Sequence, residues 1–346
     1  MLREPAPLAA LTGALADADR LVLLGDLLEL RHGPESEAVA VAAEPLRRIG
    51  TALGPDREVI YLPGNHDHHV LAGWFARRAR AAAGEKGGGR PAPLGLDVEV
   101  EPVSEESLGQ LAALLAPARL TVRYPGVWLR EDVFATHGHY LDVHMTMPTL
   151  ERLGAGVMGR IAGHPPSTLR SPDDYEAVLA PIYAWIHALA QRVPPERSGN
   201  LHGGSVRGWR ALTGSGRRGL RNRAMAAGFP VLVAALNAAG IGPLRAELSS
   251  AALRGAGLRA MEAVAAQLGV SAPHVIFGHT HRAGPLPGDD RLEWGTAGGA
   301  ALVNTGCWVQ EPSFTGSEPS RSPYRVGFAV WVDQTGPPRL VNLLDA

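Results

Sequence analysis

The 346-residue sequence has little of several residue types, and each shortage limits what the protein can be. Cys307 is the only cysteine, so an intrachain disulfide is excluded, which fits a reducing compartment. Lys86 is the only lysine, but arginine supplies the other cationic side chains and the formal net charge is −1. This near balance gives no reason to expect a nucleic-acid partner.

The sequence also lacks the hydrophobic runs that enter membranes. No apolar segment of a secretory signal stands near the start, where Pro5 and Pro7 interrupt the chain. The longest uncharged stretch, Ala224–Leu244, has the length of a membrane span but is rich in Ala and Gly and is broken by Pro230 and Pro243. We expect a buried or surface-docking helix pair there, and a cytoplasmic protein with at most peripheral contact with a membrane.

Short apolar runs alternate with stretches of helical periodicity, which is typical of an α/β sheet. Residues 20–24 and 58–62 are predicted as strands buried on both faces, and residues 35–53 as the helix between them. A hairpin is expected around a turn at Tyr124-Pro125-Gly126. The other predicted elements are a helix over 6–18 and strands over 132–136, 274–277, 301–304 and 326–331.

A helical texture begins near Met145 and continues to Leu253. Within it, Ser171-Pro172-Asp173-Asp174 offers a cap, a proline in the first turn and acids at the positive end of the helix dipole. These patterns predict an α/β core in two pieces, residues 1–144 and 254–346, with a helical cap or insertion over 145–253.

Four polar clusters each follow a strand-like apolar run. They are Gly25-Asp26, Gly64-Asn65-His66-Asp67, His137-Gly138-His139 and Gly278-His279-Thr280-His281. Gly-Asp alone is common turn chemistry, and a lone histidine is more often structural than a ligand. The two tetrads are less frequent by chance, so the ordered set favours a functional site.

In this order the clusters resemble the calcineurin-like metallophosphoesterases, which carry Gly-Asp, Gly-Asn-His-Asp, a single His after a strand, and Gly-His-x-His. The late Asn304-Thr305-Gly306-Cys307 is similar to that family's closing Asn-x-Gly-Ser segment, with Cys307 in place of Ser. The resemblance covers both halves of the core but not the insertion. It implies a sandwich of two mixed sheets flanked by helices.

The resemblance also implies a centre of two divalent metal ions, of Mn, Fe or Zn, which suit carboxylate and imidazole ligands. Asp26 would bridge the two cations, and His281 would belong to the first. The remaining ligands of the second cation would be Asn65, His137 and His279.

Catalytic roles follow from the same resemblance. His66 would contact the scissile phosphate and donate a proton to the leaving oxygen, and Asp67 would orient it. His139 is expected near the second cation. The simplest interpretation of the neighbouring histidines is as loop residues at the rim of the site: His32, His68 and His69.

The family's first motif, Asp-x-His on the first strand, is absent from the sequence. No histidine precedes His32, and residues 6–18 already read as the helix that follows that strand, so a missing first core strand is expected. The open explanations are a start upstream, a truncated protein that binds one cation, or an inactive relative. Because deleting a central strand leaves backbone groups unpaired, the first is favoured, and the 346-residue form should have low stability and weak activity.

Arginine is concentrated in the predicted insertion. Eight arginines and no Asp or Glu lie between Arg197 and Arg245, counting both ends. This segment is either a solvated basic loop or a cap whose arginines bind phosphate and whose helices meet a lipid tail or a membrane surface. The candidate substrate-binding arginines are Arg207, Arg210, Arg217 and Arg218.

The sequence therefore predicts a hydrolase that uses metal-activated water to cleave a phosphate ester or phosphoanhydride. Its substrate would be a phosphate-containing small molecule, including a nucleotide- or lipid-linked phosphate. The alternative is an impaired or inactive binding protein of the same fold. The missing Asp-x-His favours that alternative, and the intact pairs His66-Asp67 and His279-x-His281 oppose it.

Overall fold

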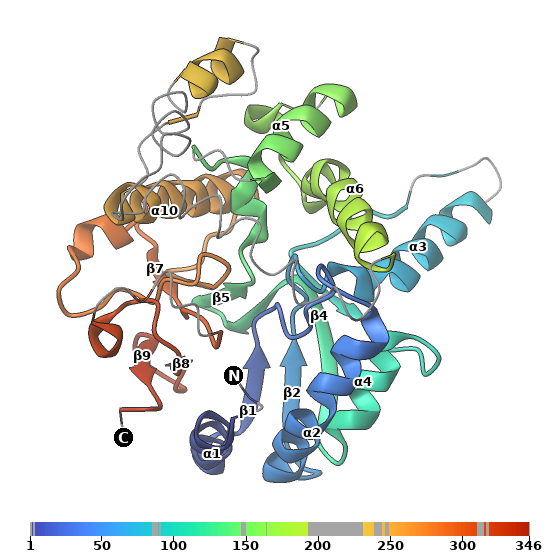
Figure 1. Ribbon diagram of the computed structural model, residues 1–346, viewed down its shortest axis with the longest axis vertical. Coiled ribbons are helices and arrows are strands. Elements are labelled where there is room, and N and C mark those ends of the chain that lie inside the picture. The colour runs from blue at the N-terminus through green and yellow to red at the C-terminus, as the bar shows by residue number, and fades with distance from the viewer. Residues whose placement is uncertain are drawn as a thin grey trace, which may run out of the picture.

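The computed structural model describes residues 2, 4–84, 89, 91–146, 150–163, 165–192, 231–238, 244–245, 249–309, 315 and 318–345. Within them, seven strands form one curled sheet in the order β1-β2-β4-β5-β6-β7, with β3 paired to β4 (Figure 1). The strands are β1 Arg20–Leu23, β2 Glu58–Tyr61, β3 Asp97–Val100, β4 Arg119–Arg130, β5 Val133–Thr136, β6 His274–Phe277 and β7 Ala301–Asn304. A separate hairpin consists of β8 Phe328–Trp331 and β9 Arg339–Asn342.

Strand β4 joins the two halves of the sheet. Its first half pairs in parallel with β2 and antiparallel with β3, and its second half pairs antiparallel with β5. The predicted turn at Tyr124-Pro125-Gly126 is therefore wrong, because strand pairing continues through these residues. Tyr124 is fully buried, and the Gly126 N–H donates to the carbonyl of Leu96, so packing and pairing override the local turn preference.

The predicted sandwich of two mixed sheets is also wrong. The strands belong to one mostly parallel sheet, because the 12 residues of β4 pair with both halves. Alternation along β2 divides the core: Val59 and Tyr61 face the helices, while Ile60 faces the inside of the curl. The hairpin packs Val330 and Leu340 against that inner face. The architecture is a half-barrel with a small hairpin against its inside.

Among the described strands none is missing between β1 and β7, and the expectation of a missing first core strand stays a prediction, because such a strand would pair with the free edge of β1. β1 pairs directly with β2 over four residues, and in the described part of the chain the strands follow one another from β1 to β7 without a gap. In this part of the chain β1 is an edge strand, and its last three side chains are half-buried.

Helices cover the outer face of the first half of the sheet, below and beside β1 and β2 in Figure 1. Helix α2 confirms the prediction for residues 35–53: it buries Leu46, Ile49 and Leu53 at helical spacing. The other helices on this side are α1 Pro5–Ala14, continued by η1 Leu15–Asp17, and α4 Ser107–Leu115.

Helices α5 and α6 lie at the end of the molecule toward which β1 and β2 point (Figure 1). Helix α6, Pro172–Ala190, begins with the predicted cap: Ser171 Oγ accepts from the Asp174 N–H, and the Asp174 carboxylate accepts from the Ser171 N–H. The remaining elements are η2 His68–Leu71, α3 Ala72–Gly84, η3 His139–Val143, α5 Leu150–Ala162, η4 Pro166–Thr168, α10 Ser250–Gln267, η6 Arg291–Trp294 and η7 Pro319–Arg321.

Much of the predicted insertion lies outside the described residues, including Arg207, Arg210, Arg217 and Arg218. The division into a two-piece core and an insertion stays a prediction. In the described ranges, no helix has both the length and the apolar character needed to cross a membrane.

Candidate metal centre

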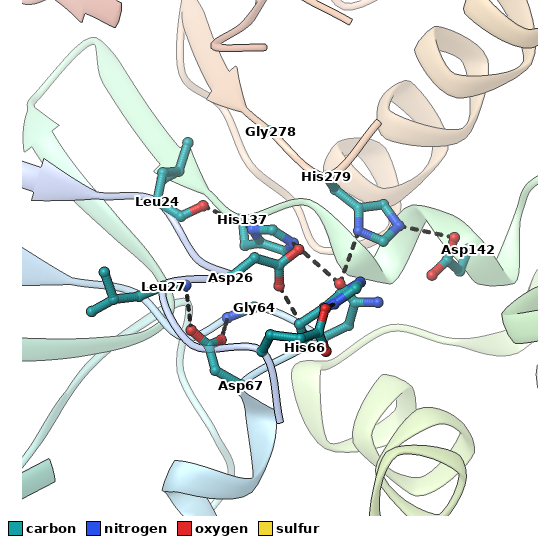
Figure 2. Close-up of polar contacts among 12 residues, drawn as sticks. Leu24, Asp26, Leu27, Gly64, His66, Asp67, His137, Asp142, Gly278 and His279 are labelled. Atoms are coloured by element: carbon teal, nitrogen blue, oxygen red, sulfur yellow. Dashed lines mark hydrogen bonds and ion pairs between the residues drawn. The ribbon is translucent and has the colours of Figure 1, made fainter. Parts of the chain in front are cut away.

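Three of the predicted ligands form a group that can hold a metal ion (Figure 2). Asp26 follows β1, His137 follows β5 and His279 follows β6, so each lies past the carboxyl end of a strand in the same sheet. One ligand atom from each lies within 4.8 Å of the other two. The side chains are largely sequestered, with exposed fractions of 20% for Asp26, 3% for His137 and 12% for His279.

Asn65 brings a fourth ligand atom to the same point. Its Oδ1 lies 3.3 Å from Nε2 of His137 and 3.1 Å from Nδ1 of His279. The same Nε2 of His137 lies 3.4 Å from Oδ2 of Asp26. The structure thus gathers all four residues that the sequence assigned to the second cation.

The far side of each imidazole is held by the protein. Nδ1 of His137 donates to the carbonyl of Leu24 at 2.8 Å, and Nε2 of His279 contacts Oδ1 of Asp142 at 3.0 Å (Figure 2). A carbonyl or an ionised carboxylate can only accept, so these two nitrogens carry the protons. When a cation occupies the centre, the rings are neutral and turn Nε2 of His137 and Nδ1 of His279 toward it as lone pairs, in the manner of oriented metal ligands.

Asp26 is held in the same way, because its Oδ1 accepts the backbone N–H of His66 at 3.0 Å. Its Oδ2 is left to face the imidazoles. Four acceptor atoms then converge, and acceptors at 3.1–3.4 Å repel one another unless a proton or a cation lies between them. Burial raises the pKa of Asp26, but the charges of His137, His66 and His279 outweigh it and hold that pKa well below its usual range.

Burial and the neighbouring charge also oppose each other in setting the pKa of His137. Burial lowers the pKa of its imidazole, but the Asp26 carboxylate outweighs burial and raises that pKa. A proton on the ring is thus stabilised where a metal cation would satisfy the same carboxylate.

Backbone strain falls on the predicted ligands. Among the described residues, the non-glycine residues with positive φ are Asp26 at 53°, His279 at 62° and His281 at 62°. Such angles cost non-glycine side chains free energy and persist only where the surroundings enforce them. The loops after β1 and β6 therefore hold these side chains in place rather than leaving them free.

Two glycines of the motifs permit this close approach. A Cβ at Gly25 would lie 2.1 Å from Nδ1 of His137, and a Cβ at Gly64 would lie 2.4 Å from Oδ1 of Asp26. Both distances are far below van der Waals contact, so the two loops can approach the ligands only without side chains at these positions.

This chain matches no protein-family profile, no curated protein and no solved structure. The assignment of the site therefore depends on its own residues and geometry.

His66 lies beside the centre with 26% of its side chain exposed. Its Nδ1 is 2.7 Å from Oε2 of Glu29, a residue that the sequence did not single out. Burial lowers the pKa of His66, but Asp26 and Glu29 together raise it to about 9. Glu29 also contacts His32, which joins the predicted rim residue to the site.

The expectation that Asp67 orients His66 is wrong: among the described residues, the hydrogen-bond partners of Asp67 do not include His66. Its carboxylate instead accepts the backbone N–H groups of Leu27 and Gly64 at 2.6 Å each (Figure 2). It also accepts the hydroxyl of Tyr61 at 2.6 Å. This buried carboxylate ties the loop after β1 to the loop after β2. Asp67 therefore fixes the backbone that presents Asp26 and His66.

His139 lies beside the centre, since its ring centroid is 5.6 Å from that of His137. Its Nε2 lies 3.2 Å from the hydroxyl of Tyr124, whose ring stacks on the imidazole. The same hydroxyl donates to Glu176 of α6, and Glu176 also contacts Nε2 of His68 at 2.9 Å. His68 is 7% exposed, so its interpretation as a rim loop residue was wrong.

His281 lies outside the metal-binding group. Burial lowers the pKa of its imidazole to about 4, against a smaller opposite effect of Asp26. Asn304 supports the loop that carries both histidines, since its Nδ2 donates to the Gly278 carbonyl at 2.8 Å and to Thr280 Oγ1 at 2.9 Å.

Proposed function

We propose that this protein is a metal-dependent hydrolase that cleaves a phosphate ester or phosphoanhydride. The proposal is supported above all by the four acceptor atoms that converge while their far sides are already held. A divalent cation such as Mn²⁺, Fe²⁺ or Zn²⁺ fits this set of carboxylate, amide and imidazole donors. When bound, the cation supplies Lewis-acid chemistry, since it polarises a phosphoryl oxygen and lowers the pKa of water.

His66 is the residue that handles the proton in this proposal. Glu29 holds Nδ1 of its ring, and the Asp26 carboxylate holds its backbone N–H. A protonated imidazole held at the edge of the centre can donate to the leaving oxygen of the substrate as the phosphorus–oxygen bond breaks. Glu29 acts as a positioning residue, because it touches the imidazole rather than the substrate.

The proposal assigns one resident cation to this centre. Among the described residues, His281 belongs to neither of the two groups of His, Asp and Glu with metal-binding spacing. A second cation, shared by Asp26 and held by His281, would depend on further ligands.

The substrate class includes phosphates linked to an apolar group. Several large apolar side chains of the predicted insertion are exposed: Val157, Trp185, Leu189, Val231 and Leu232. They favour a substrate or a surface with an apolar part, in a cytoplasmic protein that touches a membrane peripherally. A gain in hydrolysis rate with a lipid-linked phosphate over the free phosphate ester would test this extension.

The test of the main proposal is hydrolysis of chromogenic phosphomonoesters and phosphodiesters with added Mn²⁺. His279→Ala removes one ligand, and His274→Ala is the matched control, because His274 begins β6 at the opposite end of the strand from the centre. We expect the wild type and the control to hydrolyse at least one ester and His279→Ala to lose that activity. If the wild type holds metal but hydrolyses neither ester, the hydrolase proposal fails.

The rival function is a binding protein without catalysis, and it is favoured because the motif residues that the structure describes form one cation position rather than two. Such a protein would bind phosphate in a metal-dependent way and release it unchanged. Calorimetric binding of a non-hydrolysable phosphonate, alongside absent hydrolysis of the matching ester, would identify this rival.

A further inference from the structure

A second group of ligand-type side chains lies outside the centre described above. It consists of Glu35, His69 and His187, which we call the Glu35 cluster, and one ligand atom from each lies within 4.8 Å of the other two. Glu35 begins α2, His69 lies in η2 and His187 lies near the end of α6. The cluster therefore joins α6 to two elements far from it in the sequence.

His187 has the features of an oriented ligand. It is 8% exposed, and its Nδ1 is buried without a hydrogen-bond partner. In a neutral imidazole with its proton on Nε2, this Nδ1 carries a lone pair. A buried nitrogen left without a partner costs free energy, which a cation would recover.

A cavity gives access to the other two members of the cluster. Glu35 and His69 line a cavity of about 400 Å³ that Glu105 and Glu106 also line; Arg77 pairs with Glu106, and none of the described residues in the cavity wall is itself an arginine or a lysine. Carboxylates that line a cavity concentrate cations there. The cavity also leaves room for the imidazole of His69 to turn.

That turn is needed for binding. The rings of His69 and His187 are stacked face to face, with centroids 3.6 Å apart and planes 13° from parallel. Imidazole lone pairs lie in the ring plane, so two parallel rings cannot both direct one at the same cation. Rotation of His69 about its Cβ–Cγ bond, toward the cavity, removes this conflict.

We propose that the Glu35 cluster is a second cation site, which takes a transition-metal ion such as Zn²⁺ through Glu35, His69 and His187 and leaves the remaining coordination to water. Two imidazoles and one carboxylate are a common ligand set for that ion. The ion would fasten α6 to the start of α2 and to η2. The loop between β1 and α2, which carries Asp26 and Glu29, is bonded to the same region, since the Leu30 N–H donates to the His66 carbonyl.

The experiment counts bound Zn²⁺ by elemental analysis after dialysis against a fixed free concentration. The first centre is disabled by His279→Ala in every protein, so that only the second site is counted. We expect His279→Ala to retain a cation that both His279→Ala/His187→Ala and His279→Ala/Glu35→Gln lose, while His279→Ala/His274→Ala retains it. Equal zinc content in all four proteins would overturn the proposal, as would no zinc in any of them.

Glu35→Gln keeps the shape of the side chain and still offers an oxygen to the hydroxyl of Ser107, its present partner. It therefore gives a result even if His187→Ala fails to fold. Hydrogen exchange provides a second readout on folded His279→Ala: Zn²⁺ should slow amide exchange in residues 172–190, and unchanged exchange there would count against the site. Neither readout uses hydrolysis, so this proposal can fail independently of the proposed function.

Discussion

The two histidine and carboxylate groups of this molecule differ in how completely the protein prepares them. At the first centre, Asp26, His137 and His279 have their far sides held, and two of the three sit in strained backbone. In the Glu35 cluster one ring is oriented, but its partner stacks on it and lines an open cavity. The first group is preorganised for one geometry, and the second must rearrange to bind.

This difference separates the kinds of work that the two sites suit. Catalysis depends on ligands fixed before the substrate arrives, since reorganisation during the reaction raises the barrier. A structural cation site can tolerate the free-energy cost of rotating one imidazole, because the cation binds once and stays bound.

Removing a ligand of the first centre should have the largest effect. Asp26→Asn keeps the shape of the side chain but removes the charge that stabilises both a cation and the protonated imidazoles. We expect the hydrolysis rate to fall by more than about a hundredfold at fixed Mn²⁺. Steady-state assays beside His274→Ala would measure it, and retention of more than a tenth of the wild-type rate would break the proposed contrast.

Asp142 should matter next, because it holds His279 from behind at 3.0 Å. Asp142→Ala frees the imidazole to rotate and to change its tautomer, so metal affinity should fall by about 10–100-fold. Competition with a chelator of known affinity would measure the change. Asp142→Asn retains an acceptor oxygen and should lose less, and equal losses in the two variants would rule out the proposed orienting role.

The Glu35 cluster should have a smaller effect, seen in stability. If zinc binds the folded chain alone, a free concentration a hundred times the Kd adds about 2.7 kcal/mol to the free energy of unfolding. Zn²⁺ should raise the Tm of His279→Ala through the Glu35 cluster, and this rise should be absent in His279→Ala/Glu35→Gln. Thermal unfolding with and without Zn²⁺ measures it, and the same rise in both proteins would show that the cluster binds no zinc.

The smallest effect concerns the contact between Glu176 of α6 and His68, which attaches the helix without a cation. Burial raises the pKa of Glu176, but the charge and hydrogen bond of His68 and the bonds from Tyr124 and Tyr140 outweigh it and lower that pKa. The ionised Glu176 therefore stabilises the fold fully above its unfolded pKa of about 4.5, and this contribution is lost as the pH falls through the lower folded-state value.

Glu176→Gln should remove this part of the acid sensitivity. Urea unfolding at neutral pH and at several values below 4.5 would show a shallower decline for the variant than for the wild type. The free energy of unfolding at neutral pH should also fall, by about 1–3 kcal/mol, because His68 loses its charged partner. Parallel pH profiles in the two proteins would contradict this account of the helix attachment.

Local patterns were enough to predict the strands over 20–23, 58–61, 133–136 and 274–277, because each is a short apolar run that ends in turn chemistry. The gathering of Asp26, Asn65, His137 and His279 was anticipated through the resemblance of the motifs to calcineurin-like metallophosphoesterases, and local patterns alone did not predict it. The sandwich and the turn within β4 were wrong, since hydrogen bonding across a sheet depends on partners distant in the sequence.

The residues that the sequence missed share one property: their partners are remote. Glu176 meets His68 across 108 positions, and Glu29 meets His66 across 37. Asp142 carried the only local signal, because it follows His137 closely in a short buried segment. Helical periodicity treats an acid such as Glu176 as a solvent-facing side chain, so its burial follows only from the placement of α6 against the sheet.

Anomalous diffraction from crystals soaked in Mn²⁺ tests the central claim most directly. We predict a peak about 2.0–2.3 Å from Oδ2 of Asp26, Oδ1 of Asn65, Nε2 of His137 and Nδ1 of His279, after a small contraction of the four side chains. A crystal that holds manganese elsewhere while these four atoms surround only water would contradict the account.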